Sequence, residues 1–276
     1  MAEKYTKGTF ILEVIAILIA ILFLVPFYFV VANSLKPFKD IILNALSLPK
    51  GLYFKNYTEA FKILDYPKVF ANSLIITLIS NCGLVIISSM AAHWLVRHPK
   101  GISKVFFTLF ISAMIIPFQA IMIPMVKVAH NMGWINSYYG IIFCYLGFGV
   151  SLTVFLYHGF IKGIPVELEE AAIVDGCSVY RVFWSIVFPL LKPITVTVII
   201  LNSLWIWNDF LLPLLVIPNE KYRTIPLAAN AFFSQYTKQW DLALAGLVMS
   251  IIPIIILFLS LQKFIIKGIT AGSVKG

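Results

Sequence analysis

The sequence predicts an all-α membrane protein with six transmembrane helices. Hydrophobic residues make up 61% of the 276 residues, charged residues make up only 12%, and the mean hydropathy is +0.95. Soluble domains carry about 25% charged residues. Several uncharged runs also exceed the length of about 20 residues that a helix needs to cross a bilayer. We therefore expect one polytopic domain that occupies residues 1–276.

Six apolar runs supply the predicted spans. They are residues 10–32, 69–96, 105–126, 137–158, 189–212 and 242–262. The first run follows two lysines but lacks a convincing small-residue cleavage site, so we expect an uncleaved span rather than a signal peptide. An even number of spans places both termini on one side. Basic residues divide almost evenly between the two sides, so charge does not decide which side is cytoplasmic.

Polar residues and prolines interrupt the second and third runs. Ser73, Thr77, Ser80 and Asn81 form one polar stripe at helical spacing in the second run. That stripe indicates either close helix packing or a pore lining, and the sequence does not separate the two. The third run contains Pro117, Gln119 and Pro124 in its far half. Irregular backbone at such depth must be buried in protein or line a cavity.

One carboxylate lies near the end of the fifth run. Asp209 would cost about 2.5 to 3.5 kcal/mol at mid-span, so it is either functional or a cap or interhelical partner near the interface. We name Asn208, Asp209, Gln119 and Thr77 as candidate residues of a substrate pathway.

The cysteines and histidines do not predict a metal site. The three cysteines are far apart, and the four histidines, His93, His98, His130 and His158, form no ligand set. The net charge of +9 forms no basic stripe with interleaved aromatics, so nucleic acid is not an expected partner. No paired-carboxylate or Ser-His-Asp arrangement predicts an enzyme.

The most polar stretch, residues 163–188, lies between the fourth and fifth runs. Four of the twelve acidic residues gather there: Glu167, Glu169, Glu170 and Asp175. The glutamates suit the first turn of a helix, with Pro165 at its first position and Gly176 ending it in a left-handed conformation. Ser178 can cap a second helix. We predict a helix-turn-helix outside the bilayer, with Glu167 and Glu169 solvated.

This stretch resembles the EAA loop of ATP-binding-cassette importer permeases. Glu170-Ala171-Ala172 is followed after three residues by Gly176, and after nine more by Ile186-Val187-Phe188-Pro189, with Phe188 where the family has Leu. Residues 207–210 and 268–276 resemble the carbohydrate-uptake branch, in particular the second permease subunit of maltose-type importers. The resemblance covers nearly the whole chain and implies the type I importer permease fold.

The resemblance also implies how the chain would work. Its EAA helices would be cytoplasmic coupling helices that dock into a cleft on an ATPase. The implied coupling residues are Glu170, Ala171, Ala172, Asp175, Gly176, Ile186 and Pro189. Ala171 and Ala172 would keep the docking face narrow, and Glu170 would meet basic groups of the partner. The tail after Lys263 is expected to contact the ATPase pair.

The implied partners are a second related permease, two cytoplasmic ATPase subunits, an extracytoplasmic solute-binding protein and membrane lipid. The chain has no Gly-Lys-Ser or Gly-Lys-Thr, so it lacks a phosphate-cradling loop, and ATP and magnesium are expected on the partner ATPases. The expected location is the bacterial cytoplasmic membrane, with both termini cytoplasmic. The alternatives are an importer permease for another solute, a secondary transporter or channel working alone, and a structural scaffold.

Overall fold

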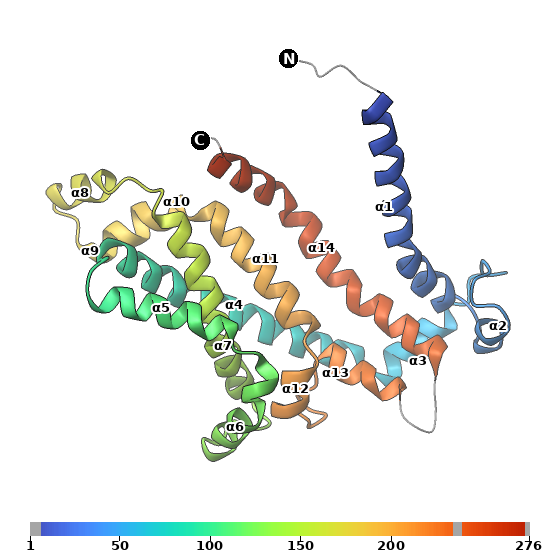
Figure 1. Ribbon diagram of the computed structural model, residues 1–276. Helices are drawn as coiled ribbons and strands as arrows, with labels where there is room; N and C mark the ends of the chain where they lie inside the picture. Colours follow the sequence, from blue (N-terminus) through green and yellow to red (C-terminus); the bar gives the residue numbers. More distant parts are fainter. Residues whose placement is uncertain (1–6, 234–238, 274–276) are drawn as a thin grey trace. The chain divides into compact units, whose positions relative to one another are not determined.

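The computed structural model describes residues 7–233 and 239–273, and every secondary-structure element in those ranges is helical (Figure 1). The helices are α1 (Lys7–Ser34), α2 (Phe38–Leu43), α3 (Lys55–Ile63), α4 (Tyr66–Arg97), α5 (Ile102–Ile115), α6 (Phe118–Asn131), α7 (Tyr138–Ile161), α8 (Glu167–Val174), α9 (Val179–Val182), the π-helical turn η1 (Phe183–Val187), α10 (Phe188–Leu190), α11 (Lys192–Asn208), α12 (Leu211–Val216), α13 (Ile225–Ala229), the 3-10 turn η2 (Asn230–Phe232) and α14 (Trp240–Ser273). The expected all-α class is confirmed for the described residues.

The chain forms two compact units. Unit 1 comprises Met1–Tyr66 and Ala229–Ile252, and unit 2 comprises Pro67–Ala228 and Pro253–Gly276. Unit 1 contains α1, α2, α3, η2 and the first part of α14, whereas unit 2 contains nearly all of α4, α5 to α12, most of α13 and the second part of α14. The predicted coupling stretch and all candidate pathway residues therefore belong to unit 2.

Among the described residues, four helices are long and apolar enough to cross a membrane. They are α1, α4, α7 and the part of α14 up to Gln262. The count rises to six if two bent pairs of helices each form one span: α5 with α6, which meet at 106°, and α9–α10 with α11, which meet at 75°. By length and composition, the described residues thus provide four to six candidate spans, and the predicted six is the upper value.

The third apolar run is broken where its prolines begin. Helix α5 ends at Ile115, and α6 begins at Phe118 after an extended Pro117 with φ −69° and ψ 141°. Proline disfavours the helical conformation of the residue before it, and Ile116 accordingly has ψ 116°. Pro124, in contrast, lies inside α6 without ending it. The predicted span over residues 105–126 therefore comprises two helices, and the interruption lies at Pro117, one of the positions where the sequence predicts irregular backbone.

Helix α4 packs closely against its neighbours through small and polar residues. A Cβ atom on Gly83 would lie 2.7 Å from a terminal methyl group of Leu146 in α7, so a larger residue here would require the leucine side chain to move. Within the polar stripe, Ser73 accepts a hydrogen bond from the Ile225 amide at 2.9 Å, and Asn81 donates to Ser203 of α11 at 3.1 Å. Ser73 and Asn81 thus take part in contacts between helices.

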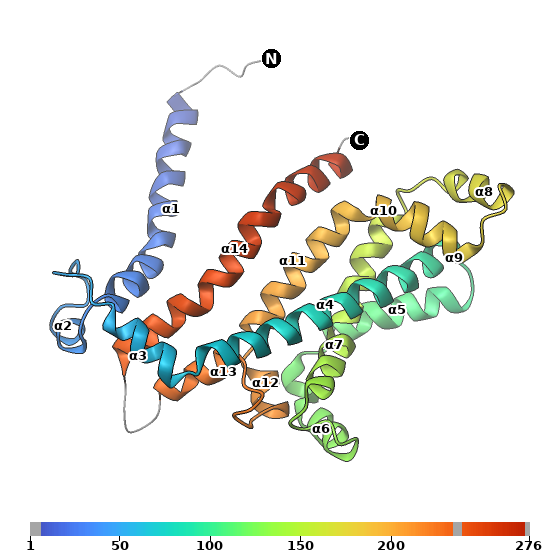
Figure 2. The same cartoon turned by 180° about the vertical axis from the view of Figure 1, so that it is seen from behind.

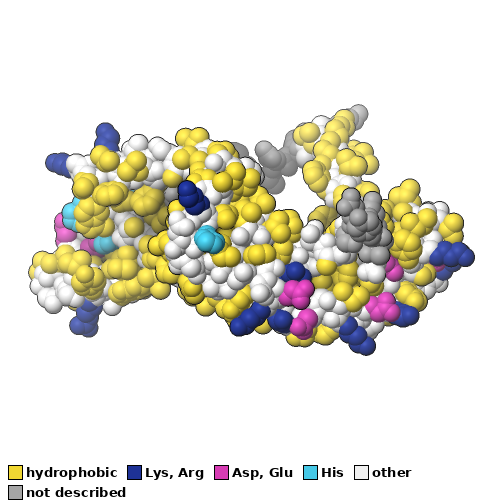
Figure 3. All heavy atoms as spheres, turned by 90° about the horizontal axis from the view of Figure 1, so that it is seen from below, with side chains coloured by type: hydrophobic (Ala, Val, Ile, Leu, Met, Phe, Trp, Pro, Cys, Tyr) yellow, Lys and Arg dark blue, Asp and Glu magenta, His cyan; other side chains and the backbone are white. Residues whose placement is uncertain are grey.

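The surface of the protein is largely apolar, as a bilayer requires. On the face drawn in Figure 3, hydrophobic side chains predominate and charged side chains lie in small separate groups. Helix α1 is the extreme case, because none of its most apolar window is buried within the chain. Such a surface is stable only against lipid tails or other membrane helices.

Candidate functional site: the α8–α9 turn and the cavities of unit 2

Helix α8 lies at one end of unit 2, well away from α6 (Figures 1 and 2). Helix α8 begins at Glu167, after Val166 in the capping position. The prediction that Pro165 occupies the first helical position is therefore wrong by two residues, because Pro165 precedes the cap. The prediction that the glutamates fill the first turn is confirmed for Glu167, Glu169 and Glu170.

The turn between α8 and α9 has the predicted geometry. Gly176 has φ +84°, a left-handed conformation, and its amide donates to the Ile173 carbonyl at 2.9 Å. Ser178 precedes α9 and accepts a hydrogen bond from the Arg181 amide at 3.4 Å. A glycine that ends one helix and a serine that caps the next fix the direction of the chain here.

Helix α8 has a wide exposed face and a narrow buried one. Six of its eight residues are exposed, and the apolar ones among them are Leu168 (45%), Ala171, Ile173 (52%) and Val174 (87%). The exposed face continues across the turn to Val179 (67%) and Tyr180 (72%). We call the six exposed apolar residues of α8 and α9 the apolar docking face: Leu168, Ala171, Ile173, Val174, Val179 and Tyr180. Glu170 is also exposed.

The buried face of α8 consists of Glu169 and Ala172, which are 6% and 7% exposed. Two sequence-based assignments are therefore wrong. Glu169 does not solvate the helix, and Ala172 does not point outward to enter a cleft, because it packs into the core of unit 2. The two residues are three positions apart, and residues at that spacing share one helix face.

The Glu169 cluster consists of Glu169, Arg97 and His93. Arg97 donates to Glu169 Oε1 from Nε at 2.8 Å and from a terminal nitrogen at 2.5 Å, while His93 Nε2 lies 2.8 Å from Oε2. Burial alone would raise the pKa of the Glu169 carboxyl group. Hydrogen bonds and charge from Arg97 and His93 outweigh burial and hold that pKa below its ordinary value. Glu169 is therefore an ion at neutral pH.

The remaining predicted coupling residues lie at different depths. Asp175 is exposed and ends α8, and Pro189 is exposed in α10. Ile186 is half-buried in η1 and packs against the same core that holds Ala172. The predicted coupling stretch thus combines a mostly exposed helix, α8, with a turn, η1, that packs against the core of unit 2.

Gln119 and Asp209 line one cavity of about 320 Å³. Asp209 accepts a hydrogen bond from the Leu211 amide and another from the Tyr145 hydroxyl group, each at 3.0 Å. Asp209 therefore acts as a cap and as an interhelical partner, which is the structural one of the two interpretations that the sequence allows. Gln119 is exposed, and Trp205 forms an aromatic wall nearby.

The other two pathway candidates lie elsewhere. Thr77 lines a separate cavity of about 540 Å³ with Asn81 and Ser203. Asn208 is exposed, and its amide group donates to the Leu204 carbonyl of its own helix at 2.8 Å. The structure thus brings together only Gln119 and Asp209 among the four.

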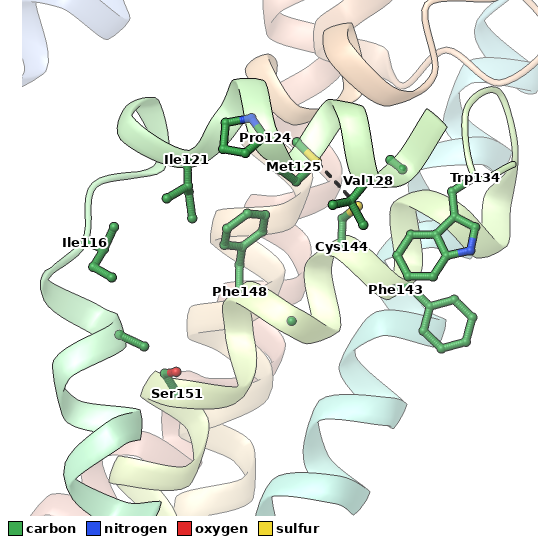
Figure 4. Close-up of a pocket in the computed structure, with 13 residues that line it drawn as sticks. Ile116, Ile121, Pro124, Met125, Val128, Trp134, Phe143, Cys144, Phe148 and Ser151 are labelled. Atoms are coloured by element: carbon green, nitrogen blue, oxygen red, sulfur yellow. Dashed lines mark hydrogen bonds between the residues drawn. The ribbon is translucent and has the colours of Figure 1, made fainter. Parts of the chain in front are cut away.

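The bend between α5 and α6 borders a cavity of about 620 Å³ (Figure 4). Ile121, Met125, Trp134, Phe143 and Phe148 line it, and Met125 Sδ lies 3.9 Å from Cys144 Sγ. The lining offers almost no polar group to orient a ligand. The irregular backbone near Pro117 therefore borders a cavity, as expected for a break at this depth.

Comparison with known proteins gives a consistent result. The family described as binding-protein-dependent transport system inner membrane component matches residues 83–271, more than half of the chain. A crystal structure of a bacterial ABC transporter involved in the import of the acidic polysaccharide alginate contains a chain with a TM-score of 0.77 to this one. That match covers 94% of this chain and 98% of the other at 23% sequence identity, and so supports the fold alone.

Two curated relatives match over almost their entire length. The probable starch degradation products transport system permease protein AmyC of Thermoanaerobacterium thermosulfurigenes is 45% identical over 273 residues, which are 99% of each chain. The melibiose/raffinose/stachyose import permease protein MelC of Bacillus subtilis is 37% identical over 277 residues, which cover 100% of each chain.

Proposed function

Because the chain belongs to the family of binding-protein-dependent transport system inner membrane components, we propose that it is the permease subunit of an ATP-driven importer of sugars or oligosaccharides. The names of its relatives support this cargo, since they refer to starch products, to melibiose, raffinose and stachyose, and to arabinooligosaccharides. They favour a sugar over the alternative of a non-sugar solute. The chain is a transport component rather than an enzyme.

The observation that carries the coupling role is the apolar docking face on a helix at the end of unit 2. Leu168, Ile173 and Val174 are exposed together on one short helix, and exposed apolar patches of this kind mark surfaces that a partner covers. The acidic Glu170 beside this face can pair with a basic group of that partner. An ATPase subunit is the partner that the family implies, and ATP and magnesium would bind there.

The complete assembly would contain two ATPase subunits, a second related permease and an extracytoplasmic solute-binding protein. The exposed apolar surface of α1 supports contact with lipid and with the second permease. We place α8 and both termini in the cytoplasm and all six runs in the bacterial cytoplasmic membrane. The tail after Lys263 is expected to contact the ATPase pair, and its side chains lie outside the described residues.

ATP-dependent uptake tests this function directly. Proteoliposomes that contain the full complex should accumulate a radiolabelled oligosaccharide only when ATP and the solute-binding protein are both present. Uptake by this chain alone, driven by an ion gradient, would instead establish a secondary transporter. Uptake of amino acids or inorganic ions, but no sugar, would support the alternative cargo.

Cysteine crosslinking tests the docking face and distinguishes the exposed side of α8 from its buried side. After Cys82, Cys144 and Cys177 are replaced by serine, a cysteine at the exposed Ala171 or Val174 should crosslink to the ATPase in the assembled complex. A cysteine at the buried Ala172 is the matched control and should react weakly. Equal crosslinking from Ala171 and Ala172 would contradict the observed orientation of α8, and crosslinking from none of the three would contradict docking.

We also propose that Gln119 and Asp209 face the sugar pathway. A planar amide group and a carboxylate near the Trp205 ring provide the polar and aromatic groups with which proteins bind sugars. Asn208 and Thr77 remain candidates of the same pathway, although they lie outside this cavity. Asp209 also holds the start of α12, so Gln119 gives the cleaner test.

Gln119→Ala should lower the apparent affinity of transport for the sugar without disturbing assembly of the complex. We expect the KM for transport to rise about threefold to tenfold at a similar maximal rate, because one ligand hydrogen bond is lost. Ser112→Ala, an exposed polar position of α5 that does not line this cavity, serves as the control. An unchanged KM for Gln119→Ala would exclude Gln119 from the pathway.

A further inference from the structure

We propose that the Glu169 cluster fastens α8 to the end of α4, so that α4 is the span that receives the movement of α8 most directly. This inference rests on the proposed function, in which α8 docks on an ATPase. Glu169 and Arg97 would be positioning residues, since neither is placed on the exposed docking face.

Helix α8 has few ways to transmit force into unit 2. Only Glu169 and Ala172 of its eight residues are buried. The side chain of Ala172 is a single methyl group, which makes non-directional contacts and resists sliding poorly. The carboxylate of Glu169, in contrast, uses both oxygens in charge-assisted hydrogen bonds, which are strong and directional. The specific attachment of α8 therefore depends on Glu169.

The other side of the attachment is the last turn of α4. Arg97 is the final residue of α4, and besides Glu169 it binds the Ile164 carbonyl, in the link between α7 and α8, at 3.2 Å. His93 lies one turn earlier, and its ring centroid is 5.3 Å from that of Phe183 in η1. The end of α4 thus contacts α8, the segment before it and a turn after it.

The chain segments that join α8 to α7 and to α11 are irregular. On one side, residues 162–166 join it to α7 without helical structure. On the other, the chain passes through the Gly176 turn, the π-helical turn η1 and a bend of 75° before it enters α11. The Glu169 cluster, in contrast, is a direct contact between α8 and a long apolar helix, α4.

Neutralising Glu169 should uncouple α8 from α4 while the docking face stays intact. In the full complex, we expect Glu169→Gln to lower sugar uptake per ATP hydrolysed about tenfold, within the usual range of coupling between sites. The ATPase should still copurify, because Glu170 and the exposed apolar residues are unchanged. Glu167→Gln removes the same charge from an exposed position of the same helix and should transport like the wild type.

A distance measurement tests the attachment itself. Spin labels at the exposed native Cys82 of α4 and at Val174→Cys of α8, in a chain with Cys144 and Cys177 replaced by serine, report how far α8 moves relative to α4. We expect a narrow distance distribution that Glu169→Gln broadens and Glu167→Gln does not. This measurement needs only the permease in a membrane and is independent of transport.

The two readouts separate the failure of this inference from that of the proposed function. If the complex with wild-type permease shows no ATP-dependent sugar uptake, the function is wrong, whereas the distances still test the attachment. If the wild type transports and Glu169→Gln has the same uptake per ATP, the Glu169 cluster does not transmit the movement of α8. If Glu169→Gln has the wild-type distance distribution, the Glu169 cluster does not fasten α8 to α4.

A second variant covers the case in which Glu169→Gln does not fold. Arg97→Lys keeps a positive charge but cannot reproduce both the paired donation to Glu169 and the bond to Ile164. We expect an intermediate loss of coupling and an intermediate broadening of the distances. Wild-type values in both measurements for this variant would overturn the inference.

Discussion

Gly176→Pro is expected to abolish transport while the permease still inserts into the membrane. Three features of the α8–α9 turn oppose proline. The backbone φ of Gly176 is +84°, whereas the proline ring fixes φ near −65°. The Gly176 amide, which proline lacks, donates to the Ile173 carbonyl at 2.9 Å. Finally, Asp175 has φ −71° and ψ 6°, in a region that a residue before proline avoids.

Together these effects should cost at least about 3 kcal/mol, a shift of about a hundredfold in the population of the native turn. The apolar docking face would then no longer be continuous across the turn, so ATP hydrolysis would not drive uptake. None of the four long apolar helices includes Gly176, so the amount of protein in the membrane should stay near the wild-type level.

Gly176→Asn is the matched control for this substitution. A Cβ atom on Gly176 would have no neighbour within 4 Å, so conformation rather than space limits the position. Asparagine tolerates the left-handed region and keeps the amide. It should retain most of the uptake of radiolabelled oligosaccharide. Equal loss in both variants would mean that bulk, not backbone conformation, is the cause, and full transport by Gly176→Pro would show that the turn is not needed.

The sequence anticipates the local features of the coupling stretch because they depend on neighbours along the chain. Gly176 ends a helix and Ser178 caps the next through interactions that span only a few residues. The break near Pro117 is likewise local, since proline acts on its own backbone and on the preceding residue. Even there, the 106° bend depends on the packing of α5 and α6 and is not contained in the prolines.

The depth of each side chain in α8 could not be predicted in the same way. Three glutamates in a first turn look equivalent, and only tertiary contact separates the buried Glu169 from the exposed Glu167 and Glu170. Its partner Arg97 is 72 residues away, and a basic residue at the end of an apolar run is already explained by the bilayer flank. The four-residue spacing of His93 and Arg97 was the one available signal that these two share a helix face.

Glu170→Lys is expected to detach the ATPase from the permease. Glu170 is exposed beside the apolar docking face, so its charge is available to a partner rather than to its own chain. Reversing a charge that faces basic groups introduces like-charge repulsion, which costs several kcal/mol at an interface. We expect the affinity for the ATPase to fall at least about a hundredfold. Copurification of the ATPase with the tagged permease, followed by uptake in proteoliposomes, measures both consequences.

Glu167→Lys provides the control, because it reverses a charge in the same first turn and carries the same unfavourable interaction with the helix dipole. If Glu170 contacts the partner, Glu167→Lys should keep the ATPase bound while Glu170→Lys loses it. Equal loss in both would point to destabilised α8 rather than a specific contact. The contrast with Glu169→Gln is equally informative: Glu170→Lys should separate the subunits, whereas Glu169→Gln should leave them joined but poorly coupled, because one residue faces the partner and the other faces α4.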